Sequence, residues 1–205
     1  MVKTPEGYLR KPHSNGFVSP LAANAVISAG QLHLGDVRMD EIIQEAELFR
    51  VPAETEPLRE EKAAKLHVTL FRTEPDHAEA ILSEAGRETA KAMISTQLST
   101  RARAMLTAAP WTVGAWLLGR WAGQHAWMFA GSGVFSVLPD MEFQIVGNPI
   151  TKGVKDTNIH TSIWQEKLFE QIFQSLVDPR LICREMKSEA AGHAACQFAF
   201  MLREE

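Results

Sequence analysis

The sequence predicts an α+β fold in which an antiparallel sheet of about four strands packs on a helical layer. Apolar residues recur at helical spacing from residue 21 to about residue 122. Two later regions are rich in aromatic and β-branched residues and are divided by short turns, which is typical of hairpins. In the last segment, residues 196–202, apolar side chains alternate with other residues, as expected for a strand with one buried face. Tight turns between neighbouring strands make the sheet antiparallel.

The N-terminal region reads as an irregular arm followed by helices. The arm carries three prolines and ends at Pro20, a residue that can open a helix. Asp36 or Asp40 is a candidate cap for the second helix. Helices are expected over 21–33, from residue 36 or 40 to 49, over 58–71, from 75 to about 107, and from 111 to about 122. We expect residues 1–74 to form the arm and first helices and residues 75–205 the main domain, within one compact unit.

The strands are expected in the C-terminal third. Residues 127–137 and 141–146 form the first predicted hairpin, with Pro139-Asp140 between them. A helix over 163–177 follows, because apolar residues recur every four positions. Residues 181–188 and 196–202 form the second predicted strand pair around Gly192-His193.

Composition excludes several classes of protein. The chain has 205 residues, 45% apolar and 22% charged, which is typical of globular domains. Its net charge of -4 argues against a nucleic-acid partner, which would need a basic face. Two cysteines cannot form a disulfide framework and favour a reducing compartment. No apolar run reaches the ~18 residues of a membrane span, and the first residues lack a signal-peptide pattern. We therefore expect a cytoplasmic protein.

The sequence lacks the common nucleotide and metal motifs. Its one dense glycine segment, Gly131-Ser132-Gly133, has no third glycine at the required spacing and precedes a predicted strand. There is no phosphate loop and no His-Glu-x-x-His helix. The charged stretch Arg59 to Lys62 is interpreted as a solvated helix face.

An aromatic segment is the strongest candidate for a ligand site. Four tryptophans fall within seventeen positions, and two phenylalanines follow: Trp111, Trp116, Trp121, Trp127, Phe129 and Phe135. Such rings suit a large planar ligand, with His125 as a candidate axial ligand of a metal at its centre. Arg101 and Arg103 are candidates for ligand carboxylates. The alternative is ordinary core packing, with His125 bonded to a carbonyl and the arginines solvated.

The two cysteines allow a weaker metal hypothesis. Cys196 lies near Glu185 and His193 in the sequence, and His160 could approach from the preceding loop. The alternative is that Cys183 and Cys196 are buried thiols, because no Cys-x-x-Cys pair exists.

Three segments resemble a known family. Residues 124–133, QHAWMFAGSG, are similar to the HAW-x-FAGSG stretch of the family named for a 4-vinyl reductase domain, which has members in bacteriochlorophyll biosynthesis. Residues 164–179 look like the helix of that family. Residues 185–198 resemble its terminal Glu-x-x-Cys and Gly-x-x-x-Cys-x-Phe pattern. The resemblance covers about residues 75–202.

This resemblance implies a fold related to the Bet3-type trafficking subunits, often as a homodimer. It also implies a zinc held by cysteine and acidic ligands in some relatives. Glu185 and Cys196 match that pattern, but Ser188 and Ser162 stand where cysteines are expected. Hydroxyls are poor zinc ligands at neutral pH, so zinc is not expected to be retained and the pair would be a vestige of that site.

The resemblance implies two possible functions. One is reduction of a vinyl group on a divinyl chlorophyllide, for which the chain offers no dinucleotide motif and too few cysteines for an iron–sulfur cluster. The other, which we favour, is a non-catalytic carrier that binds Mg-protoporphyrin and passes it between magnesium chelatase and a methyltransferase. The ring is expected against Trp121, Trp127 and Phe129, with His125 as axial ligand and Arg101 near its carboxylates. A dimeric interaction module without a ligand is the remaining alternative.

Overall fold

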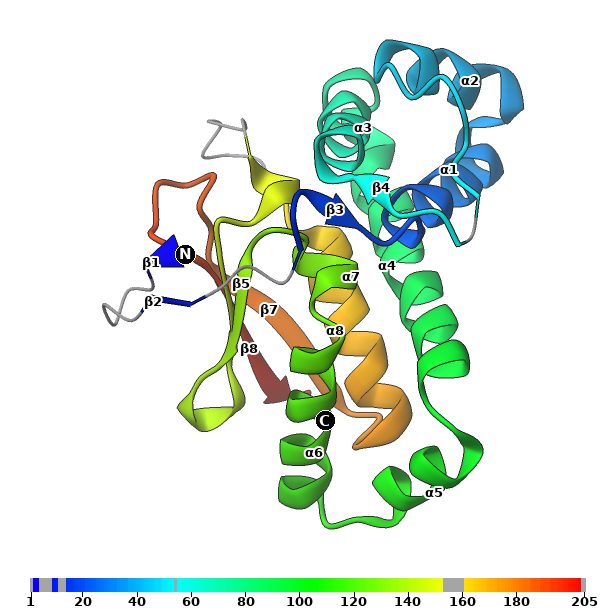
Figure 1. Cartoon of the computed structure of the whole chain (residues 1–205). Coiled ribbons are helices and arrows are strands. Elements are labelled where there is room, and N and C mark those ends of the chain that lie inside the picture. Colours follow the sequence, from blue (N-terminus) through cyan, green and yellow to red (C-terminus); the bar gives the residue numbers. More distant parts are fainter. Residues whose placement is uncertain (1, 4–8, 11–13, 54, 153–160, 204–205) are drawn as a thin grey trace.

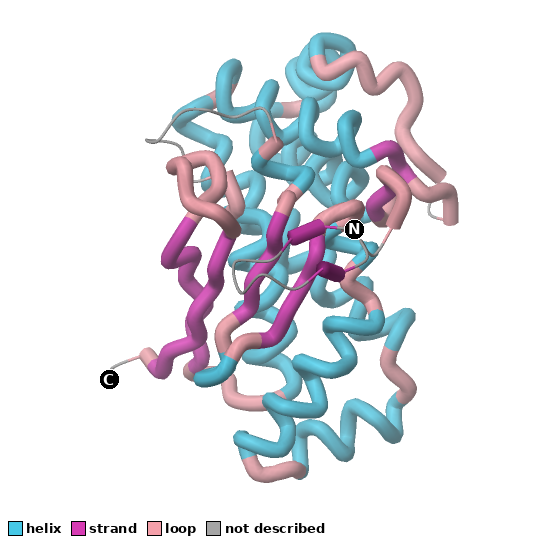
Figure 2. The backbone as a smooth tube through the Cα atoms, turned by 60° about the vertical axis from the view of Figure 1, so that its left-hand side comes forward, coloured by secondary structure: helices cyan, strands magenta, loops and turns pink. Residues whose placement is uncertain are grey.

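The computed structural model describes residues 2–3, 9–10, 14–53, 55–152 and 161–203. Its centre is a four-stranded antiparallel sheet in the order β5-β6-β8-β7. These strands are β5 (Val134–Val137), β6 (Phe143–Val146), β7 (Leu181–Lys187) and β8 (Cys196–Leu202). Two short pairs lie outside this sheet: β1 (Val2–Lys3) with β2 (Leu9–Arg10), and β3 (Phe17–Val18) with β4 (Leu58–Arg59). Figure 2 shows the strands beside the helices.

The helices form a layer against the sheet and a further group at one end of the molecule (Figure 1). They are α1 (Leu21–Leu34), α2 (Asp36–Glu45), α3 (Glu60–Thr73), α4 (Pro75–Gln97), α5 (Thr100–Ala108), α6 (Trp111–Gln124), α7 (Trp127–Ala130) and α8 (Ile163–Leu176). Two 3₁₀ turns, η1 (Pro139–Met141) and η2 (Pro149–Thr151), follow β5 and β6.

Helix α8 packs on the sheet, and α4 packs along α8. The α4–α8 contact depends on Gly86, since a Cβ built there would lie 2.4 Å from the Trp164 carbonyl oxygen. Between α8 and the sheet, phenylalanine rings meet edge to face, with centroids 5.1 Å apart for Phe143 and Phe169 and 5.2 Å apart for Phe169 and Phe198. One hydrophobic cluster runs from Val18 to Phe198 and includes residues of α1 to α8.

The predicted α+β class and antiparallel sheet are confirmed, but four predicted elements are wrong in their bounds. The helix predicted to reach residue 49 ends at Glu45. The segment predicted as a strand from residue 127 begins instead with the helical turn α7. In this turn Met128 N–H bonds the His125 carbonyl, and Ala130 N–H bonds the Ala126 carbonyl. Gly131 then takes a φ of +52°, which ends the turn and lets the chain enter β5.

The helix predicted from 75 to about 107 is two helices. Leu98 is extended, with φ -120° and ψ 122°, so α4 ends there. Ser99 then caps α5, because its side chain accepts a hydrogen bond from the Ala102 N–H. The change of direction carries α5 away from α4 (Figure 1).

The helix predicted from residue 58 starts at Glu60, because Leu58 and Arg59 pair with β3. The predicted aspartate cap of α2 is also wrong: Asp36 lies inside the helix, Gly35 precedes it, and no side chain caps it. In β8, Cys196 and Phe198 are buried, whereas Leu202 is 55% exposed because the strand continues past the core.

Candidate ligand-binding site

A histidine and a tryptophan form the centre of the candidate site at the C-terminal end of α6. His125 follows the last residue of α6, and its Nδ1 lies 2.9 Å from the Trp121 carbonyl oxygen. A carbonyl only accepts, so Nδ1 carries the hydrogen and the neutral ring keeps a lone pair on Nε2. The Trp121 indole lies beside the imidazole, with centroids 5.0 Å apart and planes tilted by 36°. A hydrogen bond of this kind orients histidines that bind metals.

Two nitrogen donors in this part of the chain are buried and lack partners. The indole Nε1 of Trp121, a residue only 9% exposed, has no hydrogen-bond partner, and neither has Nε of Arg103 on α5. Leaving a buried donor unpaired costs about 1–3 kcal/mol. Native proteins place such groups mainly where a ligand, an ion or water completes them. Both nitrogens are enclosed by protein atoms, so a ligand could reach them only if neighbouring side chains moved. Arg103 also lies on α5, which leads into the first residue of α6, whereas Trp121 and His125 lie at the last turn of that helix.

The structure separates the other predicted ring residues. Trp127 is half-buried and packs against the core. Phe129 is fully buried, and its ring meets Phe135 and Phe169 edge to face at 5.2 and 5.1 Å. Phe129 therefore supports the site from the core and presents no free surface. Arg101 is exposed on α5.

Trp111 and Trp116 lie toward the other end of α6, each 55% exposed. Ten residues divide Trp111 from Trp121, about 15 Å along a helix. Trp111 lines a separate pocket of about 350 Å³ at the end of the sheet, with Met141, Phe200 and Leu202 among its walls. The four tryptophans therefore do not form one surface.

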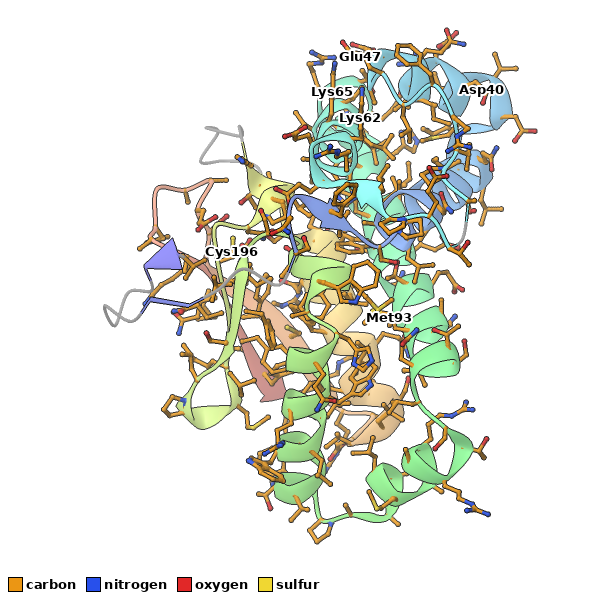
Figure 3. The ribbon with its side chains drawn as sticks, in the orientation of Figure 1. Asp40, Glu47, Lys62, Lys65, Met93 and Cys196 are labelled. Carbon is orange, nitrogen blue, oxygen red and sulfur yellow. The ribbon has the colours of Figure 1, made fainter. Side chains whose placement is uncertain are left out.

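The predicted vestige of a zinc site is a buried cluster of polar side chains (Cys196 is labelled in Figure 3). Cys196 Sγ lies 3.8 Å from Ser162 Oγ and 4.0 Å from Thr151 Oγ1. Ser188 Oγ is buried without a hydrogen-bond partner. Burial, followed by the charge of Glu185, raises the pKa of the Cys196 thiol to about 11.

The described part of this donor set does not fit zinc; His160, also a candidate ligand, lies outside the described residues. Within residues 14–53, 55–152 and 161–203, no three histidine, cysteine or acidic side chains are placed to hold a metal ion. Zinc requires about four nitrogen, sulfur or carboxylate ligands, and a thiol with a raised pKa loses its proton reluctantly. Glu189 bonds the Gly147 and Asn148 N–H groups at 2.6 and 2.8 Å, so its carboxylate is already occupied.

The glycine-rich turn holds a carboxylate that sequence reasoning missed. Glu60, interpreted as part of a solvated face, is only 5% exposed. Its oxygens accept hydrogen bonds from Ser132 N–H at 2.8 Å and Ser132 O–H at 2.7 Å. A Cβ at Gly131 would lie 2.7 Å from the same carboxylate. The interpretation of Glu60 as solvated was wrong because the partner is 72 residues away, and only the tertiary fold brings it to α3.

The fold belongs to a class with solved members. An H-NOX protein from S. oneidensis, in an Fe(II)NO ligation state, superposes with a TM-score of 0.57 at 10% identity, over 91% of this chain and all of that one. An H-NOX mutant from T. tengcongensis gives a TM-score of 0.55 at 11% identity, over 91% and 97% of the two chains. This likeness defines an H-NOX-like fold. The expected kinship with Bet3-type subunits stays a prediction.

Sequence comparison identifies the family. The Bacteriochlorophyll synthase 23 kDa chain of Cereibacter sphaeroides is 30% identical over 186 residues, covering 90% of each chain. The protein of the same name from Rhodobacter capsulatus is 26% identical over 183 residues, covering 88% of this chain and 85% of its own length. No protein-family profile matches. The chain belongs to the family of the Bacteriochlorophyll synthase 23 kDa chain, BchJ.

A search of the described helices for one long and apolar enough to cross a bilayer finds none.

Proposed function

We propose that the protein is a non-catalytic carrier that binds a tetrapyrrole of bacteriochlorophyll biosynthesis, of the Mg-protoporphyrin type. Family membership supports the pathway, since both relatives are named for bacteriochlorophyll synthase. The observation that carries the binding proposal is the geometry of His125. Its Nδ1 is fixed to the Trp121 carbonyl, which leaves Nε2 as a lone-pair donor beside an indole.

The ring would lie against the exposed parts of His125 and Trp127, which are both half-buried, with the Trp121 indole behind the imidazole. Nε2 of His125 supplies the axial ligand to the central magnesium. Of the two arginines on α5, we assign the ring carboxylates to Arg101, because its side chain is exposed and therefore accessible to a ligand. Arg103, whose Nε is enclosed, serves as the comparator.

Solved structures of the same fold class support a tetrapyrrole as ligand. One H-NOX structure, with a TM-score of 0.55 and 12% identity, is described as probing haem distortion. At this identity the likeness concerns the fold alone. We therefore take from it only that the arrangement of helices and sheet is compatible with a tetrapyrrole.

The direct test is titration of the purified protein with Mg-protoporphyrin while recording the Soret band. We expect saturable binding, a shifted Soret band and quenched tryptophan fluorescence. His125→Ala should weaken binding about tenfold and move the Soret band back toward that of the free pigment, and added imidazole should restore it. His193→Ala, which alters an exposed histidine in the turn before β8, should change neither. Saturating pigment without any spectral change would refute the proposal.

An activity assay on the same purified protein distinguishes the carrier function from the vinyl reductase function. A carrier returns Mg-protoporphyrin unchanged and hands it on. We place it in the cytoplasm between magnesium chelatase, which supplies the pigment, and a methyltransferase, which consumes it. Turnover of a divinyl chlorophyllide with NADPH or a reduced flavin would favour the reductase instead. A homodimer that binds no pigment would favour the interaction module of the trafficking-subunit type.

We also propose that the cluster at Cys196 holds no zinc. Metal analysis of the purified chain should find less than one zinc per chain. The paired variant Ser162→Cys with Ser188→Cys adds two thiolates to Cys196 and Glu185, and it should bind one zinc tightly. Stoichiometric zinc in the unmodified protein would contradict the proposal.

A further inference from the structure

Helices α5 and α6 carry exposed apolar side chains at the end of the molecule where the chain passes from one helix to the other. We define the α5–α6 surface by six exposed side chains: Arg101, Met105, Trp111, Val113, Trp116 and Arg120. Met105 is 59% exposed, and Trp111 and Trp116 are 55% exposed each. On α6, Trp116 and Arg120 lie on the side away from the buried Ala115 and Leu118, whereas Trp111 lies on the same side as these two but one turn before them, beyond the core.

Apolar and cationic side chains are interleaved on this surface. Arg101 and Met105 are one turn apart on α5, which places them on the same face. On α6, Trp116 and Arg120 are also one turn apart, and the Arg120 guanidinium lies 5.3 Å from the centroid of the Trp116 ring. Tryptophan and arginine side chains are both suited to a boundary between apolar and aqueous phases, since each joins an apolar body to a polar end.

Cations outnumber acidic groups on this surface, and the aspartate in the wall of the Trp111 pocket, Asp178, is paired with Arg180. No aspartate or glutamate occurs between residues 89 and 139, a stretch with one lysine and three arginines, although the whole chain has a net charge of -4. Figure 1 places α5 and the start of α6 at the end of the molecule opposite α2 and α3. The arginines of α5 and α6 therefore lie away from the acidic residues of the N-terminal helices.

The opposite end shows that apolar exposure alone does not distinguish the surface. Leu32, Val37 and Phe49 are 74%, 77% and 84% exposed. Near them in the chain are several acidic residues: Asp36, Asp40, Glu41, Glu45 and Glu47. Arg38, Lys65 and Arg72 pair with acidic residues there, so that end has no excess of cations for anionic lipid. The α5–α6 surface, in contrast, joins exposed tryptophans to Arg101 and Arg120.

We propose that the α5–α6 surface docks the protein on an anionic lipid bilayer. Arginines near an anionic surface gain about 1 kcal/mol each, which is about fivefold in affinity. Tryptophan and methionine enter the boundary between headgroups and acyl chains. Trp111 also lines the 350 Å³ pocket with Phe200 and Leu202, so the apolar area continues onto the end of the sheet. This docking is independent of the pigment.

The test is flotation of the full chain with vesicles of phosphatidylcholine alone or mixed with phosphatidylglycerol. We expect binding to the anionic vesicles, and loss of that binding as salt is raised. Arg101→Gln with Arg120→Gln should weaken it about 25-fold, and Trp111→Ser with Trp116→Ser at least about tenfold. All four side chains are exposed, so both variants should keep the melting temperature of the parent.

The matched control is Leu32→Ser with Phe49→Ser, which removes exposed apolar side chains from the acidic end and should leave vesicle binding unchanged. Three results would overturn the proposal. They are absence of binding to either vesicle, equal binding to neutral and anionic vesicles, and equal loss in the control. A dimer that the Trp111 and Trp116 variant dissociates, without vesicle binding, would instead assign the surface to a second copy of this chain.

Discussion

The two ends of the segment from Trp111 to Ala130 contain the same kinds of residue and place them in opposite environments. At the first end, Trp111 and Trp116 are 55% exposed on α6. At the second end, Trp121 is 9% exposed beside His125, and Phe129 is fully buried. The difference shows that a cluster of aromatic residues in a sequence does not define one site. Their roles depend on which side of the helix faces the core and which polar groups lie beside them.

The largest expected effect contrasts the two ends directly. Phe129→Ala should lower the free energy of unfolding by about 3–5 kcal/mol, because it leaves a cavity among Phe135 and Phe169. Trp116→Ala should change it by less than about 0.5 kcal/mol, because that side chain is mostly in water. Urea unfolding followed by circular dichroism measures both. Equal losses in the two variants would remove the contrast.

His67 is fully buried, in contrast to the half-buried His125, and its burial should make the stability of the protein depend on pH. His67 is 1% exposed, and its Nε2 lies 2.9 Å from the Ala22 carbonyl oxygen. Burial lowers the pKa of His67 to about 4, whereas its ordinary value is about 6.5. Between these values the unfolded chain binds the proton more readily, so the free energy of unfolding should fall as pH falls from 6.5 to 4. The loss is on the order of 3 kcal/mol and is absent above pH 6.5.

His67→Gln tests this pH dependence, because glutamine can still donate to the Ala22 carbonyl but does not titrate in this range. The slope between pH 6.5 and pH 4 should become shallower in the variant. An unchanged slope would assign the acid sensitivity to other groups.

The buried Glu60, bound at the glycine-rich turn just beyond α7, allows the same comparison of a buried and an exposed side chain for a charged group. Glu60→Gln should lower the free energy of unfolding by about 2 kcal/mol, because a charge-assisted bond to Ser132 becomes a neutral one. Glu61→Gln, at the neighbouring exposed position, should have almost no effect. Thermal unfolding of the two variants side by side decides between a structural and a solvated Glu60.

The smallest expected effect on stability concerns the two arginines of α5. Arg103→Met removes a buried N–H that has no partner, so the free energy of unfolding should change by less than about 1 kcal/mol. Its affinity for Mg-protoporphyrin should stay that of the parent, whereas Arg101→Met, at the exposed position, should lower the affinity about tenfold. Pigment titration of both variants is the measurement. Equal affinities in the two variants would remove Arg101 from the site.

Sequence patterns predicted most of the helices and strands, but not the points at which one element ends and the next begins. The bounds predicted for β8 are those observed, because alternation over seven residues is a strong local signal. The turn at Leu98 and Ser99 was missed, since apolar spacing continues through it and the deciding feature is one backbone conformation. The helical turn α7 was read as a strand, because its aromatic residues have high strand propensity. The hydrogen bonds that the His125 and Ala126 carbonyls accept instead close a helical turn.

The candidate site was predicted only in part. His125 comes four residues after Trp121, at the end of α6. This spacing of about one helical turn brings the imidazole to the Trp121 carbonyl. The unpaired donors of Trp121 and Arg103 could not be predicted, because they depend on what surrounds each nitrogen. The grouping of Cys196, Ser162 and Thr151 depends on strands and loops that lie 34 and 45 residues apart in the chain.

By itself the sequence determined the fold class, the family and the segment in which four tryptophans lie close together in the chain. These features depend on local periodicity and on short runs of residues. Only the tertiary structure decided which tryptophans are buried, that Glu60 fills the glycine-rich turn, and that cations and exposed rings share one end of the molecule. Burial and pairing depend on contacts between segments distant in the chain, and a linear pattern of residue types does not specify those contacts.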